Sequence, residues 1–239
     1  MSLEISRGSA PSRLLSLLGD EDAGAFAALG KPAALNKGAT LYEEGTPCNY
    51  AYTLESGVLM LERLSMDGRR QVLAFVYPGD FIGIEVSGRH LVSAVALKDA
   101  TLTRYPISEI DAMARNKASV DHALKQVTNR ILAYALDQIC VLGRMDARQR
   151  LMFLFVHLMH RQMLEEPVDI DIPMTRQDMA DFLGLTMETI SRTVSRLKNE
   201  GLISQTSAHS VTINDLAHAE ELLDLSVTDR RADEFALEE

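Results

Sequence analysis

The spacing of hydrophobic residues changes near residue 107, and this change constrains the fold more than any other feature of the chain. From about Lys37 to Pro106 the apolar runs are short or alternating and are separated by glycines, as in strands joined by tight turns. From about Ser108 to Gly143 apolar residues recur every three or four positions, which is the period of a helix. We therefore expect an α+β protein in which a β-roll precedes a long helix.

Six short strands are expected in the N-terminal region, where many strands at this spacing indicate an antiparallel barrel or roll. Asp67-Gly68 lies between the third and the fourth strand and predicts a hairpin, because glycine adopts a positive φ at little cost. The expected strands are Ala39–Tyr42, Ala51–Leu54, Val58–Leu64, Gln71–Phe75, Leu91–Ala96 and Thr101–Tyr105.

The helical region carries two neighbouring apolar stripes. The first consists of Val120, Leu124, Val127, Ile131, Tyr134, Gln138 and Val141. The second consists of Thr128, Leu132, Ala135, Ile139 and Leu142. The 4-3-4-3 spacing of the first stripe suits a coiled-coil seam against a second copy of the chain. We therefore predict a homodimer with the first stripe as its interface; the alternative is a helix that packs only on the roll of its own chain.

The net charge of −10 does not decide whether the chain binds nucleic acid. Exposed charges act over only ~8–10 Å at physiological salt, so a basic surface can lie on an acidic protein. Acidic residues gather in the C-terminal tail and around Glu165–Asp171, whereas Arg192, Arg196 and Lys198 share one short segment. The charge distribution is therefore compatible with a local DNA-binding surface.

Several classes of protein are not expected. No apolar run approaches the ~20 residues that cross a bilayer, and no signal-peptide pattern is present. The two cysteines, Cys48 and Cys140, build neither a disulfide framework nor a CxxC metal site. No Ser-His-Asp, paired-carboxylate, P-loop or GxGxxG pattern occurs. We expect a cytoplasmic protein with no membrane partner, no metal site and no enzymatic activity.

A helix, a tight turn, a second helix and a small hairpin are predicted near the C-terminus. Thr175 is a good N-cap with Asp178 three residues on, and Gly184 suits a left-handed helix end. Thr186 caps a second helix that runs to about Asn199. The strands Leu202–Gln205 and Ser210–Ile213 then form the hairpin. This order is a winged helix-turn-helix.

The outward positions of the second helix predict the contacts to double-stranded DNA. A guanidinium binds both acceptors on a guanine edge, and a carboxylate accepts from the cytosine amino group. A plain solvated helix face is the alternative, and the caps and turn favour DNA. We assign base readout to Met187, Glu188, Ser191 and Arg192. We assign phosphate contacts to Thr175, Arg176, Gln177, Thr186, Thr189 and Lys198.

The segment from Met174 to Arg192 closely resembles the helix-turn-helix signature of the Crp/Fnr superfamily of bacterial regulators. Upstream, Gly38-x-x-Leu41-x-x-x-Gly45, Leu54-x-x-Gly57 and Pro78-Gly-Asp-Phe-Ile-Gly83 resemble its cyclic-nucleotide-type β-roll. The resemblance implies four segments along the chain. They are a β-roll sensor domain over 1–107, a dimerisation helix over 108–145, a DNA-binding domain over 146–225 and an acidic tail over 226–239.

Two departures from the family pattern bear on cofactors. Where cAMP-binding members carry an Arg-Ser or Arg-Thr pair for the phosphate, this chain has Leu91 and Val92. Oxygen-sensing Fnr members hold an iron–sulfur cluster with four cysteines, and this chain has two. The resemblance therefore implies a regulator without cAMP or a cluster. A pocket for another effector is expected at Phe81, Gly83, Glu85, Leu91, Val92, Leu124 and Thr128.

The recognition helix resembles that of the FixK, Dnr and NnrR groups, because Glu188, Ser191 and Arg192 reproduce their E-x-x-S-R spacing. The resemblance implies a TTGAT-N4-ATCAA-like palindrome and, for an activator, contact with RNA polymerase. A regulator that depends on haem, a gas or another small molecule is one alternative, with His90 as a candidate axial ligand. A β-roll protein-interaction module is another. His157 with His160 as a metal pair, and Cys48 or Cys140 as redox sensors, are weaker hypotheses.

Overall fold

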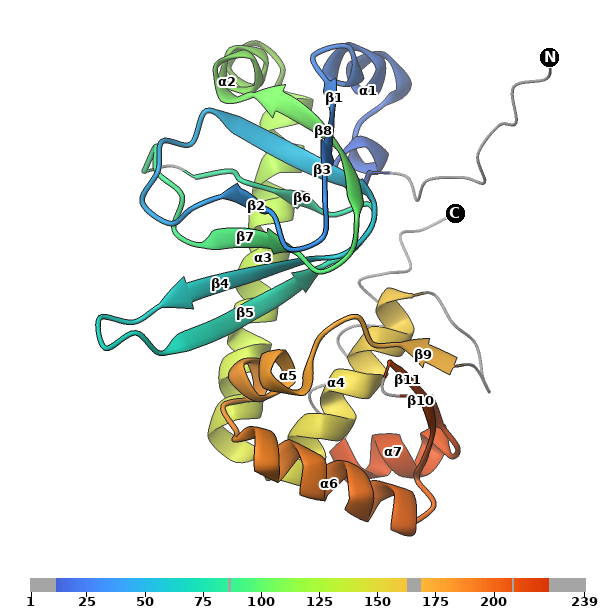
Figure 1. The fold of residues 1–239 in the computed structure, drawn as a ribbon. Helices are drawn as coiled ribbons and strands as arrows, with labels where there is room; N and C mark the ends of the chain where they lie inside the picture. Colours follow the sequence, from blue (N-terminus) through green and yellow to red (C-terminus); the bar gives the residue numbers. More distant parts are fainter. Residues whose placement is uncertain (1–11, 86, 163–168, 208, 224–239) are drawn as a thin grey trace, which may run out of the picture. The chain divides into compact units, whose positions relative to one another are not determined.

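The computed structural model describes residues 12–85, 87–162, 169–207 and 209–223 (Figure 1). They form two compact units, which divide after Ala133 within one long helix. The N-terminal unit begins with η1 (Leu15–Leu17) and α1 (Asp20–Ala27) and ends with α2 (Ile107–Asn116) and the first part of α3 (Ala118–Arg144). Its strands are β1 (Lys31–Leu35), β2 (Thr40–Tyr42), β3 (Tyr50–Ser56), β4 (Leu59–Leu64), β5 (Arg70–Val76), β6 (Phe81–Ile82), β7 (Ser93–Ala96) and β8 (Ala100–Pro106).

The strands form two four-stranded antiparallel sheets, in the orders β1-β8-β3-β6 and β2-β7-β4-β5. Side chains alternate between the faces of a strand, so β3 serves two cores. Tyr52 and Leu54 point into the space between the sheets, where they meet Leu59 and Val76. Ala51 points the other way. The predicted α+β fold and its β-roll are confirmed.

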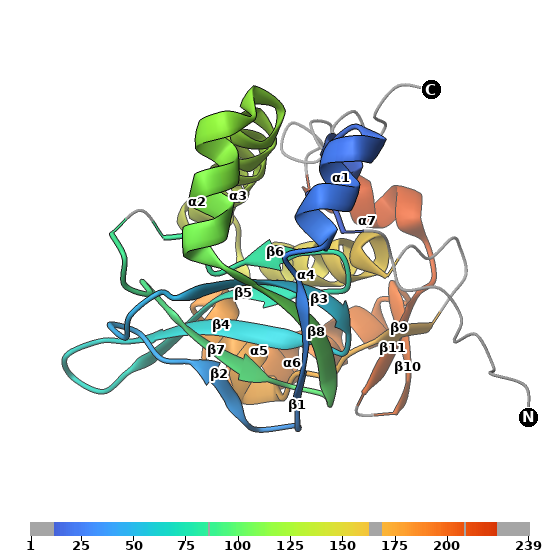
Figure 2. The same ribbon diagram turned by 90° about the horizontal axis from the view of Figure 1, so that it is seen from above.

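The outer face of the first sheet carries a second core, made with helices. Phe26 of α1 contacts the ring of Tyr105 of β8, and Ile110 of α2 and Val120 of α3 join them. Figure 2 shows α1, α2 and α3 on the same side of the strands. This core ties together α1, which precedes the roll, and α2 and α3, which follow it.

The structure adds elements that the sequence patterns did not reveal. The segment α1–β1 lies in the first 35 residues, for which no structure was expected, and β6 is only two residues long. The expected continuous helix over 108–143 is interrupted at Lys117, whose ammonium group bonds to Asp22 of α1. Hydrophobic spacing alone does not register such a break, because both helices keep the same period.

The C-terminal unit is a helical domain with a small sheet. Its elements after α3 are α4 (Ala147–Arg161), β9 (Asp169–Asp171), α5 (Arg176–Leu183), α6 (Met187–Asn199), β10 (Ile203–Ser207), β11 (Ser210–Ile213) and α7 (Leu216–Leu223). β11 pairs with both β10 and β9, so the expected two-stranded wing is extended by a third strand. Nine consecutive residues of α4, Leu151–Met159, are buried and form the centre of this unit. None of the helices described is long and apolar enough to cross a membrane.

Arg150 of α4 holds two helix ends together. Its guanidinium donates to three carbonyl oxygens, at 2.7 Å to Leu142, 2.8 Å to Met145 and 2.9 Å to Leu183. The last carbonyls of a helix have no intrahelical donor, so a charged fork satisfies them well. Arg150 therefore fixes the end of α5, from which the turn into α6 starts.

Replacing Arg150 with methionine is expected to lower the free energy of unfolding by roughly 2–3 kcal/mol, because half-buried carbonyls lose a charged donor. Arg196→Met is the matched control, since the ion pair of Arg196 with Glu200 is exposed and such pairs contribute ~0–1 kcal/mol. Urea unfolding followed by circular dichroism measures both. Equal losses for the two variants would contradict the role of Arg150.

The predicted dimer stripe divides into two parts. Val120 and Val127 are buried in the helix-side core of the N-terminal unit, and Val141 is fully buried in the C-terminal unit. The Gln138 amide donates to Phe182 O at 3.1 Å. These four side chains pack within their own chain and offer little surface to a partner, which corrects their assignment to the seam. Leu124 and Tyr134 are half-buried. The large exposed apolar side chains of α3 are Ile131, Leu132, Leu136 and Ile139.

The N-terminal unit extends beyond the predicted boundary at residue 107, and the C-terminal unit begins at Tyr134, inside the segment predicted as a separate dimerisation helix. The physical reason is that each end of α3 is buried in a different core, as Val120 and Val141 show. The acidic tail over 226–239 lies outside the described residues.

Candidate nucleic-acid interface

Local signals position α5 and α6. The Thr175 hydroxyl accepts from the backbone N–H of Asp178, and the Asp178 carboxylate accepts from the N–H of Thr175, which completes a capping box. Gly184 then adopts φ 62°, ψ 39°, a left-handed conformation that ends α5 within one residue. Thr186 caps α6 by accepting from the N–H of Thr189. The predicted caps and the predicted turn are confirmed.

One face of α6 is buried and the opposite face is open. Ile190, Val194 and Leu197 pack into the unit. The open face borders a shallow concave surface of about 560 Å³. Its lining residues are Glu188, Ser191, Arg192, Ser195, Arg196, Asn199 and Glu200. Three of the four residues assigned to base readout therefore share one surface, and the fourth, Met187, is exposed at the N-terminal end of the helix.

Glu188 and Arg192 form an ion pair across one helical turn, at 2.5 Å between Oε1 and Nη2. Both side chains are well exposed, at 70% and 79%, so the pair contributes little to stability but places a carboxylate beside a guanidinium. Arg196, one turn further, is paired with Glu200, which also binds Arg148. Arg192 is thus paired with Glu188, which is itself assigned to base readout. Arg196 is paired with Glu200, which also links α6 to Arg148 of α4.

The residues assigned to phosphate contacts differ in the hydrogen-bond donors that they have available for a phosphate. Thr175 has no donor left, because both its N–H and its hydroxyl donate to Asp178, and this corrects its assignment. The Gln177 amide donates to Asp181, and the Thr186 hydroxyl pairs with that of Thr189. Arg176 is half-buried, with an Nη1 that has no hydrogen-bond partner among the described residues. Lys198 is exposed and makes no ion pair with the residues described.

The structure does not gather the predicted effector residues around one cavity. Phe81 is buried in the core between roll and helices, Leu124 packs against the same core, and Val92 packs between the sheets. Leu91 is 57% exposed. Gly83 lies at φ 81° with Tyr50 O only 3.1 Å from where a Cβ would be, and the Thr128 hydroxyl bonds back to Leu124 O.

Glu85 is the predicted effector residue with altered electrostatics. Burial raises the pKa of its carboxyl, against a weaker opposing hydrogen bond from the N–H of Leu91. A pocket of the roll with a volume of about 310 Å³ is lined by none of the seven predicted residues. Phe81, Leu124 and Val92 instead pack in the two cores of the N-terminal unit.

The structure also places the histidines that were candidate haem or metal ligands. His90, the candidate axial ligand, is buried, with 4% exposure, and its ring stacks on Tyr42. His157 packs between the rings of Tyr134 and Phe153 inside the C-terminal unit, while His160 is exposed. Within the described ranges no group of three or more His, Cys, Asp or Glu residues is placed to hold a metal ion.

The two cysteines are free thiols. Cys48 is buried, its Sγ–H donates to Gly83 O at 2.9 Å, and burial raises the pKa of the thiol, which disfavours the reactive thiolate. Cys140 is exposed on α3.

Comparison with known families agrees with both units. Residues 149–222 match the Crp-like helix-turn-helix domain, and residues 33–117 match the cyclic nucleotide-binding domain. The nitrogen fixation regulation protein FixK of Bradyrhizobium diazoefficiens is 33% identical over 181 residues, which cover 75% of this chain and 76% of FixK. The transcriptional activatory protein AadR of Rhodopseudomonas palustris is 33% identical over 188 residues, covering 78% and 79%.

The structure of FixK2 from Bradyrhizobium japonicum is similar to this one, with a TM-score of 0.77 and 30% identity over 81% of this chain and 96% of FixK2. The β-roll, the long helix and the capped helix-turn-helix with its wing define a DNA-binding regulator. The chain belongs to the Crp/Fnr family of transcription regulators, and it is not an enzyme.

Proposed function

We propose that the chain acts as a homodimer that reads a TTGAT-N4-ATCAA-like palindrome through α6, without cAMP and without an iron–sulfur cluster. The observation that carries the sequence preference is the open face of α6, where Glu188 lies against Arg192 and Ser191 lies beside them. A guanidinium and a carboxylate held together suit one G·C pair, with the arginine on the guanine and the glutamate on the cytosine. Met187 has no donor for a second guanine, which favours TTGAT over TGTGA.

The experiment is a binding measurement with three duplexes of equal length at two salt concentrations. The duplexes carry the TTGAT palindrome, a TGTGA-type palindrome and a scrambled site. We expect the TTGAT duplex to bind most tightly. Higher salt should weaken binding to all three duplexes, but the ratio of their affinities should persist. Equal affinity for the three duplexes, or a preference for TGTGA, would contradict the proposed readout.

The assembly proposal rests on α3. Ile131, Leu132, Leu136 and Ile139 are each more than half exposed, and large apolar side chains exposed along one helix indicate an interaction surface. We propose that a second copy of α3 covers it in a two-fold arrangement, with the recognition helices about one DNA turn (~34 Å) apart. The proposed seam thus keeps Ile131 from the first stripe, takes Thr128, Leu132, Ala135 and Ile139 from the second, and adds Leu136, which belongs to neither.

Independence from cAMP follows from the segment between β6 and β7, which in cAMP-binding members holds the phosphate. Leu91 and Val92 stand where the resembling cAMP-binding members carry donors for the phosphate, and an anion without donors is costly to bind. We expect millimolar cAMP to leave both the melting temperature and the affinity for the TTGAT duplex unchanged. A saturable calorimetric signal with micromolar cAMP would contradict this prediction.

Independence from an iron–sulfur cluster rests on the chain's two cysteines, since four thiolates from one chain are required in the cluster-binding members. Because AadR is named an activatory protein and the 31% identical FnrL of Cereibacter sphaeroides an activator, we further propose activation through contact with RNA polymerase in the cytoplasm. Regulation by a small molecule is the alternative, and the pocket in the roll favours it over haem, because 310 Å³ is at the lower end of ligand pockets.

A further inference from the structure

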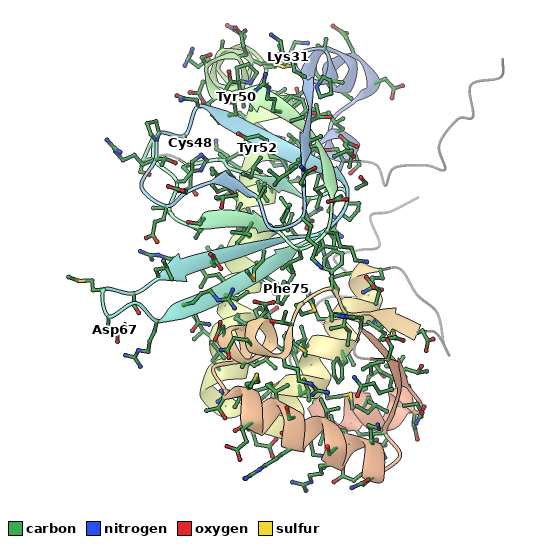
Figure 3. The ribbon with its side chains drawn as sticks, viewed as in Figure 1. Lys31, Cys48, Tyr50, Tyr52, Asp67 and Phe75 are labelled. Carbon is green, nitrogen blue, oxygen red and sulfur yellow. The ribbon has the colours of Figure 1, made fainter. Side chains whose placement is uncertain are left out.

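The pocket in the roll lies where the chain enters β3, between that strand, β2 and the loop that joins them. Figure 3 labels Cys48, Tyr50 and Tyr52 along this stretch. With a volume of about 310 Å³, the pocket accommodates a molecule of one or two small rings. Three tyrosines and one histidine are among its ten lining residues, together with polar side chains such as those of Thr46 and Asn49.

The rings form a continuous stack. The imidazole of His90 lies on the ring of Tyr42, with 3.8 Å between centroids and 8° between planes. Tyr42 in turn stacks on Tyr52, at 6.0 Å and 29°. All three are buried, whereas Tyr50 is half-buried at the pocket's edge. A rigid aromatic wall of this kind favours a flat partner, because ring pairs gain energy from offset stacking.

His90 has unused hydrogen-bonding capacity beside the pocket. Its Nδ1 is shielded from solvent and has no hydrogen-bond partner among the described residues. Burial lowers the pKa of His90 and so favours the uncharged ring, in which one nitrogen is a donor and the other an acceptor. A buried polar group without a partner is unfavourable, and a ligand that displaces the cover of Nδ1 and bonds to that atom compensates the cost.

The charges around the pocket argue against an ionic ligand. Glu43 is the charged residue in the lining, so an anion in the pocket meets a like charge and the lining itself supplies no cation. The guanidinium of Arg104 lies 5.1 Å from the centroid of the Tyr50 ring, so a ligand cation on that ring meets a like charge as well. An uncharged ligand avoids both conflicts and the cost of desolvating an ion.

We propose that this pocket binds a small, uncharged, planar aromatic molecule with one hydroxyl or ring N–H group, which packs against the tyrosine rings and hydrogen-bonds to His90. The site is distinct from the seven-residue effector pocket predicted from the sequence. It does not depend on the proposed DNA sequence preference, and its occupancy can be measured without DNA.

The backbone connects the proposed site to the cassette that follows β6. Gly45 N donates to His90 O at 2.8 Å, and His90 N donates to Thr46 O at 3.0 Å. The Arg89 guanidinium donates to Gly45 O at 2.6 Å, and Cys48 N donates to Gly88 O at 2.9 Å. A ligand that contacts both His90 and the loop before β3 therefore stabilises the cassette as well.

The test uses the full-length protein and four probes of similar size: phenol, indole, benzoate and benzyltrimethylammonium. Nuclear magnetic resonance follows the ring signals of His90 and Tyr42 during each titration. We expect saturable shifts with phenol or indole, and weak or no shifts with the two ions. Absence of a saturable shift with both neutral probes overturns the proposal, and so does tighter binding of either ion.

Three variants locate the site. His90→Phe keeps the stacked ring and removes both nitrogens, and we expect roughly tenfold weaker binding from the loss of one hydrogen bond. Tyr50→Leu, at a half-buried position, weakens binding by removing an aromatic wall and serves as the second variant if His90→Phe does not fold. Leu91→Ala is the matched control, since Leu91 is exposed and belongs to the other predicted pocket. Loss of binding in Leu91→Ala with retention in the other two variants would place the ligand in the cassette and overturn the proposal.

Discussion

Replacing Arg192 with alanine is expected to weaken binding to the TTGAT palindrome by roughly 1–3 kcal/mol per half-site, or about 5- to 150-fold, and to change binding to a scrambled duplex far less. The reason is that a bidentate arginine–guanine contact is lost only where that guanine is present. In the free protein Arg192 is bonded to Glu188 alone among the described residues, so its removal leaves the fold intact.

Two variants on the same helix serve as controls for Arg192→Ala. Arg196→Ala removes the same type of side chain one turn along, but Arg196 is paired with Glu200, so we expect a small loss on every duplex. Lys198→Ala removes an exposed cation assigned to phosphate, which weakens all sequences alike and lowers the salt dependence by about one unit per half-site.

The three duplexes of the binding experiment discriminate between these effects. If Arg192→Ala loses the same free energy on the TTGAT, TGTGA and scrambled duplexes, then Arg192 does not read a base. A Met187→Arg variant adds the missing donor at the start of α6, and we expect it to shift preference toward TGTGA-type sites. An unshifted preference would show that position 187 does not face the bases.

The sequence predicted the recognition unit well because its signals are local. A threonine cap, a reciprocal Asp178 and a glycine at the left-handed end all lie at or within the ends of one eight-residue helix, so each is visible in the printed chain. The hydrophobic period likewise placed six strands of the roll, all of those described except β1 and β6. Arg150 escaped prediction for the opposite reason: its three acceptors are the ends of two helices and a loop that only the fold brings together.

The two apolar stripes of α3 show that hydrophobic periodicity alone does not identify a dimer interface. Both stripes have the spacing of a seam, and the sequence does not say which of them the chain buries on itself. The structure decides through Val120 and Val127, which complete a core with Phe26 and Ile110, and through Gln138, which binds Phe182 O. Phe81 was misassigned to a ligand pocket in the same way, because a buried apolar side chain and a pocket-lining one look alike in sequence.

The double substitution Leu132→Glu with Ile139→Glu is expected to convert the protein into monomers. The two positions are seven residues apart, so they occupy equivalent places on α3, and both side chains are more than half exposed in the single chain. A folded monomer therefore tolerates glutamate there, whereas a two-fold seam buries four unpaired carboxylates, each at a cost of several kcal/mol. The dimer dissociation constant should rise by at least about a thousandfold.

Monomers of this variant also lose tight binding to the palindrome, because one recognition helix reads one half-site only. Sedimentation velocity at micromolar concentration measures assembly, circular dichroism verifies the fold, and the TTGAT duplex measures binding. Leu64→Glu with Met66→Glu is the matched control, since both side chains are also more than half exposed but lie at the end of the β4–β5 hairpin; it should remain dimeric and bind DNA. A Leu132→Glu/Ile139→Glu protein that sediments as a dimer would place the interface elsewhere, and a wild-type monomer would remove it altogether.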